Sequence, residues 1–453
     1  MATGISKTRW NGNGSLEKKN ELKTNNNLKL TYDGKEDENV VLTIKPALLH
    51  RIWPTHQDID GESINRLYYG DNLSILAKLL EDENILGQVK LIYIDPPFST
   101  KSIFQSRSQQ DAYTDLLSGA EYIEFIRKRL ILLRELLADD GSIYVHLDSN
   151  MAFEIKIIMD EVFGRKNFKN WITRKKCSSK NYTSKTYGKV SDFILFYSKS
   201  DNYIWNRPYD KWGKEHSEKE YSYIEETTGR RYKKVPIHAP GIRKGETGKP
   251  WRNMHPPPGK HWQFIPKTLD EMDARGEIYW SSSGNPRRKL YLDESSGVAV
   301  QDIWLEFRDA HNQNIKISGY PTEKNLNLLT RIIETSSNRD DLVLDCFSGS
   351  GTTLAEATRL RRKWIGIDNS PEAISTTLRR LVIGTEKMGD FVAKKSNKKS
   401  VITTTLNGFN ITEPVNGPSP ISSSDFHNNI SVYVSEYYQG ELDASIEKWA
   451  KYL

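Results

Sequence analysis

Two short apolar runs, Val89–Ile94 and Leu342–Asp345, constrain the fold more than any other feature, because each ends directly in a rigid or glycine-rich turn. Nearly continuous apolar runs of this length are typical of strands that are buried on both faces of a parallel sheet. Apolar residues at helical spacing follow them, over Tyr122–Leu137 and Thr352–Leu360. This alternation predicts an α/β fold with a doubly wound, mostly parallel sheet.

The same patterns recur along much of the chain. We predict further strands at Asn65–Gly70, Ser142–Leu147, Asn170–Arg174, Asp192–Tyr197 and Trp364–Ile367, and helices at Leu73–Leu80, Met151–Phe163 and Leu326–Thr335. The strands at 170–174 and 192–197 are expected to be antiparallel, at an edge of the sheet. Periodicity is lost between about 200 and 318, where Gly, Pro, Trp and basic residues accumulate.

These changes in periodicity and residue composition divide the chain into five predicted parts. They are a polar N-terminal arm (1–38), a first α/β half (39–199), an irregular insertion (200–318), a second α/β half (319–388), and a linker with a short amphipathic helix at 441–452 (389–453).

Composition excludes several classes of protein. Hydrophobic residues make up 37% and charged residues 27% of the chain, which is an ordinary globular balance. No apolar run is long enough to span a bilayer, and the N-terminus has no signal-peptide pattern, so we expect a cytoplasmic protein that does not interact with membranes. Two distant cysteines, Cys177 and Cys346, argue against disulfides, and no ligand cluster at metal spacing is found.

The segment Asp341–Thr353 (DLVLDCFSGSGTT) combines a buried strand, a glycine-containing loop and a helix start. Glycines allow a ligand to approach the backbone, and the first turn of a helix offers unpaired N–H groups. Asp368 ends the next predicted strand, where a carboxylate can accept both hydroxyls of a ribose. We therefore predict a nucleoside cofactor site, although a tight turn without a ligand is the alternative. The candidate residues of the loop are Asp345, Phe347, Ser348, Gly349, Ser350, Gly351 and Thr352.

Asp95-Pro96-Pro97-Phe98 follows the other buried strand directly. Two prolines fix the backbone and remove its N–H groups, so a carboxylate and carbonyls are presented beside an aromatic ring. Asp95 and the carbonyl of Pro96 can accept the two hydrogens of an exocyclic amine and expose the nitrogen lone pair, while Phe98 stacks on the base. The alternative is a rigid turn with a capping aspartate.

Together these residues resemble the amino-methylating DNA methyltransferases. Asp95–Phe98 is similar to their D-P-P-[YF] catalytic motif, and Phe347–Thr352 (FSGSGT) to their F-x-G-x-G cofactor motif. The order of the two motifs resembles the β group of this family, a circular permutation of the Rossmann-like sheet of S-adenosylmethionine-dependent methyltransferases. The resemblance implies S-adenosylmethionine as cofactor. It also implies cofactor contacts by Asp95, by Asp71 and Asn72, and by Thr322 and Lys324 of GYPTEK.

The resemblance extends to the modification subunits of type III restriction systems. N4-cytosine members of this order usually begin the catalytic motif with Ser, so Asp95 favours N6-adenine as the target. The chain departs from the family pattern at Glu323, Asn325 and Ser191-Asp192. An N4-cytosine enzyme, a protein or RNA methyltransferase, and a DNA-binding specificity subunit without catalysis remain alternatives. So do a homodimer and association with a restriction subunit.

Basic residues interleaved with aromatic ones suggest where double-stranded DNA binds. Residues 165–189 carry nine Lys/Arg and no Asp/Glu, and residues 230–262 carry nine Lys/Arg and one acid. Such runs are often only solvated faces, but next to a base-methylating site they suit phosphates. We predict a target recognition region at 200–318. The predicted DNA contacts are Arg174, Lys175, Lys176, Arg230, Arg231, Lys233, Lys234 and Arg252.

Overall fold

The structure is a computed structural model that describes residues 28–53, 65–97, 119–177, 185–308, 324–383 and 430–441, together with Ile446. Beyond these ranges it gives only the short backbone pairs β4 (Ile103–Gln105) with β5 (Asp111–Thr114), β18 (Lys316–Ile317) with β21 (Glu386–Lys387), and β22 (Ile402–Leu406) with β23 (Phe409–Glu413). The chain forms two compact units, one from Met1–Asn206 with Asp302–Leu453, and the other from Arg207–Gln301.

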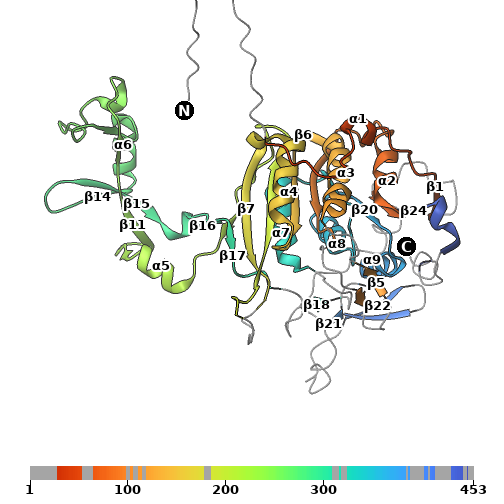
Figure 1. Ribbon diagram of the computed structural model, residues 1–453. Coiled ribbons are helices and arrows are strands. Elements are labelled where there is room, and N and C mark those ends of the chain that lie inside the picture. Colours follow the sequence, from red (N-terminus) through yellow and green to blue (C-terminus); the bar gives the residue numbers. More distant parts are fainter. Residues whose placement is uncertain are drawn as a thin grey trace, which may run out of the picture. The chain divides into compact units, whose positions relative to one another are not determined.

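A ten-stranded sheet forms the centre of the larger unit (Figure 1). Its strands lie in the order β1 (Leu49–Trp53), β24 (Ile430–Ser435), β2 (Asn65–Tyr69), β20 (Lys363–Asp368), β19 (Leu342–Asp345), β3 (Val89–Ile94), β6 (Leu137–Leu147), β8 (Ser191–Ser198), β7 (Phe168–Lys175) and β17 (Ile303–Trp304). All pairs from β24 to β6 are parallel, whereas β8 is antiparallel to both β6 and β7. The predicted fold class is therefore confirmed, and so is the antiparallel pair.

Helices cover both faces of this sheet. On one face lie α1 (Glu38–Val41), α2 (Asn72–Leu79), α3 (Ala120–Leu136) and α4 (Ala152–Met159), whose apolar side chains pack with Ile92, Ile94, Val145 and Ile367 of the strands. On the other face lie α7 (Leu326–Ser336), α8 (Thr352–Arg359) and α9 (Pro371–Ile383). Two hydrogen bonds tie strands to this second layer, Tyr144 to Ser336 and Trp364 to Thr358.

The order of the strands reverses between β19 and β3. Leu344 of β19 pairs with Ile92 of β3, although they are distant in sequence. The helices after these two strands lie on opposite faces, which opens a crevice at the carboxyl ends of the strands. Both predicted motifs begin at this point.

The ends of the chain contribute more structure than their composition predicts. The prediction of a linker is wrong for residues 430–435, because β24 pairs in parallel with β2 inside the sheet. Part of the predicted polar arm also packs on the unit, since Lys35 forms an ion pair with Glu161 and the Tyr32 hydroxyl donates to Glu124. The predicted helix at 441–452 lies almost wholly outside the described residues. The helix predicted at 151–163 passes from α4 into a π-helical turn, Asp160–Gly164.

The smaller unit, Arg207–Gln301, has its own sheet and core. Its elements are β9 (Tyr209–Asp210), α5 (Lys214–Glu220), β10 (Tyr223–Ile224), β11 (Arg231–Pro236), β12 (His238–Pro240), β13 (Lys260–Trp262), α6 (Pro266–Ala274), β14 (Ile278–Trp280), β15 (Pro286–Tyr291) and β16 (Val298–Ala299). Trp251, Trp262, Leu269 and Ile278 are central to its core. The unit is narrower than the predicted 200–318 segment, because β17 belongs to the large sheet.

Candidate active site

Three aspartates end three neighbouring strands at the crevice. Asp95 follows β3, Asp345 ends β19, and Asp368 ends β20. Because these strands are parallel, their carboxyl ends meet at one edge of the sheet. The structure thus brings together the two motifs that the sequence analysis identified, 250 positions apart.

Asp345 and Asp368 shape the glycine loop. The Asp368 carboxylate accepts the N–H of Gly349 at 2.8 Å through Oδ2 and that of Ser370 at 2.9 Å through Oδ1. Asp345 accepts the N–H of Phe347 at 3.0 Å and the hydroxyl of Thr353 at 2.6 Å. Each carboxylate therefore holds one part of the loop in place.

Gly351 cannot carry a side chain without displacing its neighbours. Its φ of +71° lies in the left-handed region, and a Cβ there would lie 2.6 Å from Oγ1 of Thr377. The same hydroxyl of Thr377 donates to the carbonyl of Gly349 at 3.1 Å. The loop is thus packed closely against α9.

The hydroxyl groups of the loop differ in their surroundings. Ser350 and Thr352 hydroxyls lie 3.1 Å apart, and Arg380 donates to that of Thr352. Ser348 is 6% exposed, yet its Oγ has no hydrogen-bond partner among the residues that the structure describes. A buried polar atom without a partner is costly, which points to a ligand or water at this position.

Burial changes the protonation of two of the three aspartates. It raises the pKa of Asp345 to about 7, although the Thr353 hydroxyl and the Phe347 N–H favour the charged form. Burial likewise raises the pKa of Asp368 to about 6 against its backbone hydrogen bonds. A ligand that donates hydrogen bonds to either carboxylate would favour its ionised form.

Asp95 keeps one acceptor unused. Its Oδ2 lies 2.6 Å from Nζ of Lys324, a residue just before α7 that the sequence analysis also predicted for the site. Its Oδ1 is buried and has no hydrogen-bond partner among the described residues. Pro96 is buried and Pro97 half-buried, whereas the predicted residues Phe98 and Thr322 lie outside the described part of the chain. An exocyclic amine is the kind of group that Oδ1 can accept from.

Asp71 and Asn72 support the loop from a neighbouring strand. Asp71 caps α2 by accepting the Ser74 N–H at 3.2 Å, and it also accepts from Arg129 at 3.0 Å. Asn72 is buried, and its side chain donates to the carbonyl of Cys346 at 2.7 Å and accepts from Arg129. Both polar atoms of Asn72 are thus used within the protein, so the structure gives Asn72 a role in positioning the loop.

Arg129 is a residue that the sequence analysis missed. Its guanidinium lies 3.5 Å from the centre of the Phe125 ring, which in turn lies 6.0 Å from the ring of Phe347. Burial lowers the pKa of Arg129 to about 10, although the charge of Asp71 opposes this shift. The only local signal was a charged residue within the apolar face of a predicted helix.

A row of buried polar side chains lies beside Asp95. The Tyr93 hydroxyl and Nδ1 of His146 are 2.8 Å apart, and Nε2 of His146 lies 3.0 Å from Oδ2 of Asp192. Arg174 donates to both oxygens of Asp192, at 2.8 and 2.6 Å. Because Arg174 is 1% exposed, the prediction that it contacts DNA is wrong. It belongs to this row instead.

Most of the other predicted DNA-binding cations have partners within the protein. In the smaller unit Arg230 pairs with Asp293 and Glu294, Arg231 lies 4.0 Å from Glu218, Lys233 pairs with Glu220, and Arg252 pairs with Asp270 and Asp273. Lys234 lies over the rings of Tyr223 and Tyr279, at 3.6 and 3.4 Å. Lys175 and Lys176 are half-buried at the end of β7.

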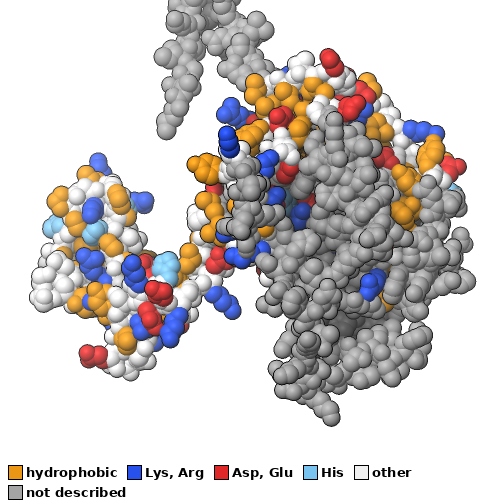
Figure 2. Space-filling view, turned by 60° about the horizontal axis from the view of Figure 1, so that its bottom comes forward, with side chains coloured by type: hydrophobic (Ala, Val, Ile, Leu, Met, Phe, Trp, Pro, Cys, Tyr) orange, Lys and Arg blue, Asp and Glu red, His pale blue; other side chains and the backbone are white. Residues whose placement is uncertain are grey.

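Other exposed cations of the smaller unit have no acidic partner among the described residues. Among them are Arg243 and Lys244 in the β12–β13 loop, Lys260 of β13 and Arg287 of β15; the others are Arg207, Lys211, Lys214, Lys219 and Lys267. Lys260 and Arg287 both contribute to lowering the pKa of His238, so these cations share one neighbourhood. Figure 2 shows Lys and Arg side chains mixed with acidic ones over this unit.

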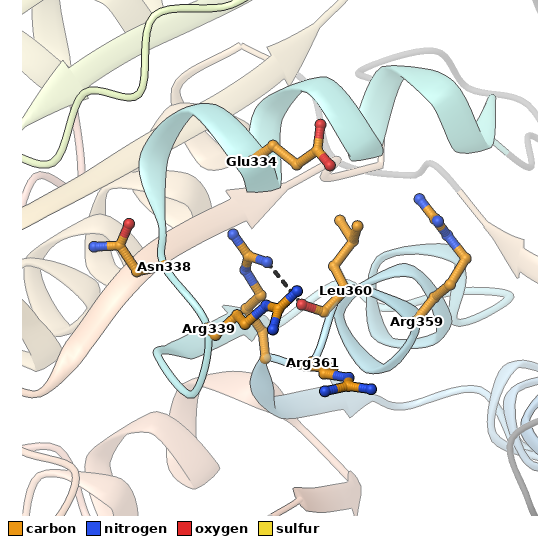
Figure 3. A pocket seen from close by; sticks show the side chains of 7 residues that line it. Glu334, Asn338, Arg339, Arg359, Leu360 and Arg361 are labelled. Atoms are coloured by element: carbon orange, nitrogen blue, oxygen red, sulfur yellow. Dashed lines mark hydrogen bonds between the residues drawn. The ribbon is translucent and has the colours of Figure 1, made fainter.

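A second concavity lies at the opposite edge of the large sheet. Glu334, Asn338, Arg339 and residues 359–362 line this open pocket, in the segments that precede β19 and β20 (Figure 3). Arg362 donates to the carbonyl of Leu360 at 2.7 Å. Because the lining segments lie at the amino ends of β19 and β20, the pocket is separate from the site at the carboxyl ends of the strands. The described residues contain neither a group of three metal-ligating side chains nor a helix long and apolar enough to cross a membrane.

An open parallel sheet, a glycine loop governed by two aspartates, and a third aspartate with an unused acceptor define the site of a Rossmann-like transferase that uses a nucleoside cofactor. A sequence model of a DNA methylase family matches residues 89–379. The chain is 46% identical over 423 residues to the type II methyltransferase M.EcaI of Enterobacter cloacae, covering 92% of this chain and 88% of the relative. The chain therefore belongs to the N6/N4 family of DNA methylases and is a DNA methyltransferase of the restriction-modification type.

More distant relatives cover less of the chain. It is 26% identical over 356 residues to the StyLTI Mod subunit of a type III restriction-modification enzyme from Salmonella typhimurium, covering 70% of this chain and 52% of that protein. The chain thus spans about half the length of that subunit. Among solved structures, the PvuII cytosine-N4-specific DNA methyltransferase aligns with 16% identity and a TM-score of 0.40, over 71% of this chain and 90% of that one.

Proposed function

We propose that this methyltransferase transfers a methyl group from S-adenosylmethionine to N6 of an adenine that is flipped out of double-stranded DNA. The observation that carries the proposal is Asp95, whose Oδ1 is a buried acceptor without a partner at the crevice. The target nitrogen is inaccessible inside a duplex, so the base has to leave the stack to reach this edge.

The residues present suit the proposed cofactor. Asp368 is placed to accept ribose hydroxyls, and the unpartnered Oγ of Ser348 offers a further polar contact. Gly351, which has no room for a Cβ against Thr377, keeps the loop in its left-handed, closely packed conformation. When bound, S-adenosylmethionine would supply a methyl group whose bond to the sulfonium breaks as the N–C bond forms, so that a neutral thioether, S-adenosylhomocysteine, departs and the methylated nitrogen loses one proton to solvent.

The protein then has little acid–base chemistry to perform. Asp95 and the Pro96 carbonyl accept the two amine hydrogens, which directs the nitrogen lone pair away from the ring. Asp95 also stabilises the positive charge that develops on this nitrogen. Lys324, 2.6 Å from the other oxygen, keeps the carboxylate oriented. Positioning therefore provides most of the rate.

Adenine is favoured over cytosine by the first residue of the catalytic motif. Asp95 stands where N4-cytosine enzymes of this motif order usually have Ser. Incubation with labelled S-adenosylmethionine and mixed-sequence duplex DNA, followed by separation of the nucleosides, tests this choice. Label in N6-methyladenosine supports the proposal, label in N4-methylcytosine replaces adenine by cytosine, and binding without transfer points to a missing partner subunit or to a DNA-binding specificity subunit.

Two variants separate chemistry from cofactor binding. Asp95→Ala is expected to abolish methyl transfer while the affinity for S-adenosylmethionine stays within a few-fold of wild type. Asp368→Ala is expected to weaken cofactor binding, because it removes the acceptor at the end of β20. Surviving turnover in Asp95→Ala would refute the assigned role of Asp95.

We propose that the unit Arg207–Gln301 recognises the target sequence. The exposed cations without acidic partners, among them Arg243, Lys244, Lys260 and Arg287, are the better candidates for phosphate contacts than the paired Arg230. Double replacement of Lys260 and Arg287 by alanine should lower the slope of log affinity against log salt concentration by about 1 per lost contact. Arg230→Ala is the control, and an equal change in both variants would contradict the assignment.

Partners and location follow from the same function. We propose that the enzyme acts in the cytoplasm, where its DNA substrate lies, either as a homodimer or together with a restriction subunit. Light scattering during size-exclusion chromatography gives the oligomeric state. A methyl-transfer assay with the purified chain alone shows whether another subunit is required.

A further inference from the structure

Four polar side chains form a continuous row across four adjacent strands of the large sheet. Tyr93 lies on β3, His146 on β6, Asp192 on β8 and Arg174 on β7. Each is at most 2% exposed, and all four lie on the face of the sheet that α7 covers. The row ends at Tyr93, two residues before Asp95, which directly follows β3, so strand alternation carried on by one residue places both side chains on the same side.

The hydrogen-bonding roles along this row are fixed by its charged end. Arg174 donates to both oxygens of Asp192. Burial alone would raise the pKa of Asp192, but the neighbouring His146 and Arg174 hold this pKa far below its usual range, so Asp192 is ionised. Nε2 of His146 lies 3.0 Å from Oδ2 of Asp192 without meeting hydrogen-bond geometry, and the ring proton belongs on this nitrogen, because a lone pair there would face the carboxylate oxygen. Nδ1 is then the acceptor for the Tyr93 hydroxyl at 2.8 Å. Burial lowers the pKa of His146, which keeps the ring neutral and this arrangement intact.

Stability alone does not account for such a row. A buried ion pair loses its hydration, and replacing it by apolar side chains of similar size is often neutral or stabilising. Its position next to the catalytic motif is the distinguishing feature. The charges of Lys324 and Asp95 both act on His146, which places the row within the electrostatic reach of the reacting edge.

We propose that the row Arg174–Asp192–His146–Tyr93 is a positioning device that holds the end of β3, and with it the Asp95 carboxylate, in the geometry that methyl transfer requires. The inference rests on the role of Asp95 proposed above. The hydrogen bond between Tyr93 and His146 is directional, so it restricts the end of β3 more than apolar packing does, and His146 is held in turn by Asp192 and Arg174 on β8 and β7. A displacement of about 1 Å at a reacting group can cost roughly a hundredfold in rate.

Two tyrosines of the sheet provide a matched test. Tyr93 and Tyr144 are register partners, both are fully buried, and each makes one hydrogen bond through its hydroxyl, that of Tyr144 with Ser336 at 2.7 Å. Only Tyr93 connects to the row. We expect Tyr93→Phe to lower kcat at least tenfold, with KM for S-adenosylmethionine within twofold of wild type. Tyr144→Phe should lower the melting temperature equally and leave kcat within twofold.

Equal kcat values for the two tyrosine variants would overturn the inference, because the row would then be a structural feature only. The role of Asp95 is tested separately by Asp95→Ala, so the two ideas can fail independently. If Tyr93→Phe does not fold, ¹⁵N-histidine NMR of the wild type provides the second measurement, with His146→Gln assigning the signal. A ring that stays neutral and protonated at Nε2 at a pH where a free histidine is half protonated supports the row, and a titration like that of a free histidine overturns it.

Discussion

We expect Asp368, proposed above to accept the ribose hydroxyls, to make the affinity for S-adenosylmethionine depend on pH. In the protein without ligand its pKa is raised to about 6 by burial. Ribose hydroxyls donate hydrogen bonds and so favour the ionised carboxylate, which lowers its pKa in the complex. The affinity is therefore fully present above pH 6 and is lost as the pH falls through this value.

The size of the effect follows from the linkage of one proton to binding. Below pH 6 the dissociation constant should rise about tenfold per pH unit, which is ~1.4 kcal/mol. Between pH 7 and pH 5 the total change is thus roughly tenfold. Protonation of Asp368 does not unfold the protein over this range, because a carboxyl with a raised pKa favours the folded state as the pH falls.

Calorimetric titration at pH 5, 6, 7 and 8 measures this dependence. Two buffers of different ionisation enthalpy at pH 5.5 should also show the release of about one proton on binding. Asp368→Asn should bind weakly at every pH and release no proton, whereas Asp345→Asn should keep the slope below pH 6. A dissociation constant that is constant from pH 5 to 8, or an unchanged slope in Asp368→Asn, would refute the reasoning.

Three further perturbations test the fold around the site. Gly351→Ala should weaken cofactor binding and lower the free energy of unfolding by more than ~1–2 kcal/mol, because the new Cβ would lie 2.6 Å from Oγ1 of Thr377. Gly34→Ala is the control for backbone strain alone, because Gly34 also has a positive φ but no atom lies within 4 Å of its Cβ position. Arg361→Gly should stabilise the protein by about 0.5–1 kcal/mol in urea unfolding, because Arg361 has a φ of +59° at the end of α8, a position that glycine prefers. Val432→Ala should cost on the order of 2 kcal/mol, because Val432 is fully buried in β24; a change below 0.5 kcal/mol would contradict the place of β24 in the sheet.

Local patterns predicted the elements that carry the two motifs. The bounds of β3 and β19 agree with the predicted strands, because a short, nearly continuous apolar run is typical of a strand buried on both faces of a sheet. Motif resemblance also placed both Asp95 and Lys324 in the cofactor site, and the two side chains lie 2.6 Å apart. β24 was missed because its six residues begin where the Ser-, Asn-, Thr- and Pro-rich stretch 389–430 ends, and their place in the sheet depends on pairing with β1 and β2.

Buried polar networks were the part that the sequence did not reveal. Arg129 and His146 act through partners on other strands and helices, and such partners have no fixed spacing in sequence. Arg174 shows how a composition argument fails, because it stands in a run of basic residues yet faces the interior. Strand alternation could have indicated this, since Ile172, two positions earlier, is buried on the same face.

The place of β24 has a consequence for how the protein is made. β1 pairs with the large sheet only through β24, and β2 has β24 as its outer neighbour. A chain emerging from the ribosome therefore exposes the edge of β2 until more than four hundred residues have been synthesised. During that interval the apolar strand is open to pairing with other chains, so expression of fragments that stop before Ile430 should yield aggregates, even though both methyltransferase motifs are complete in them.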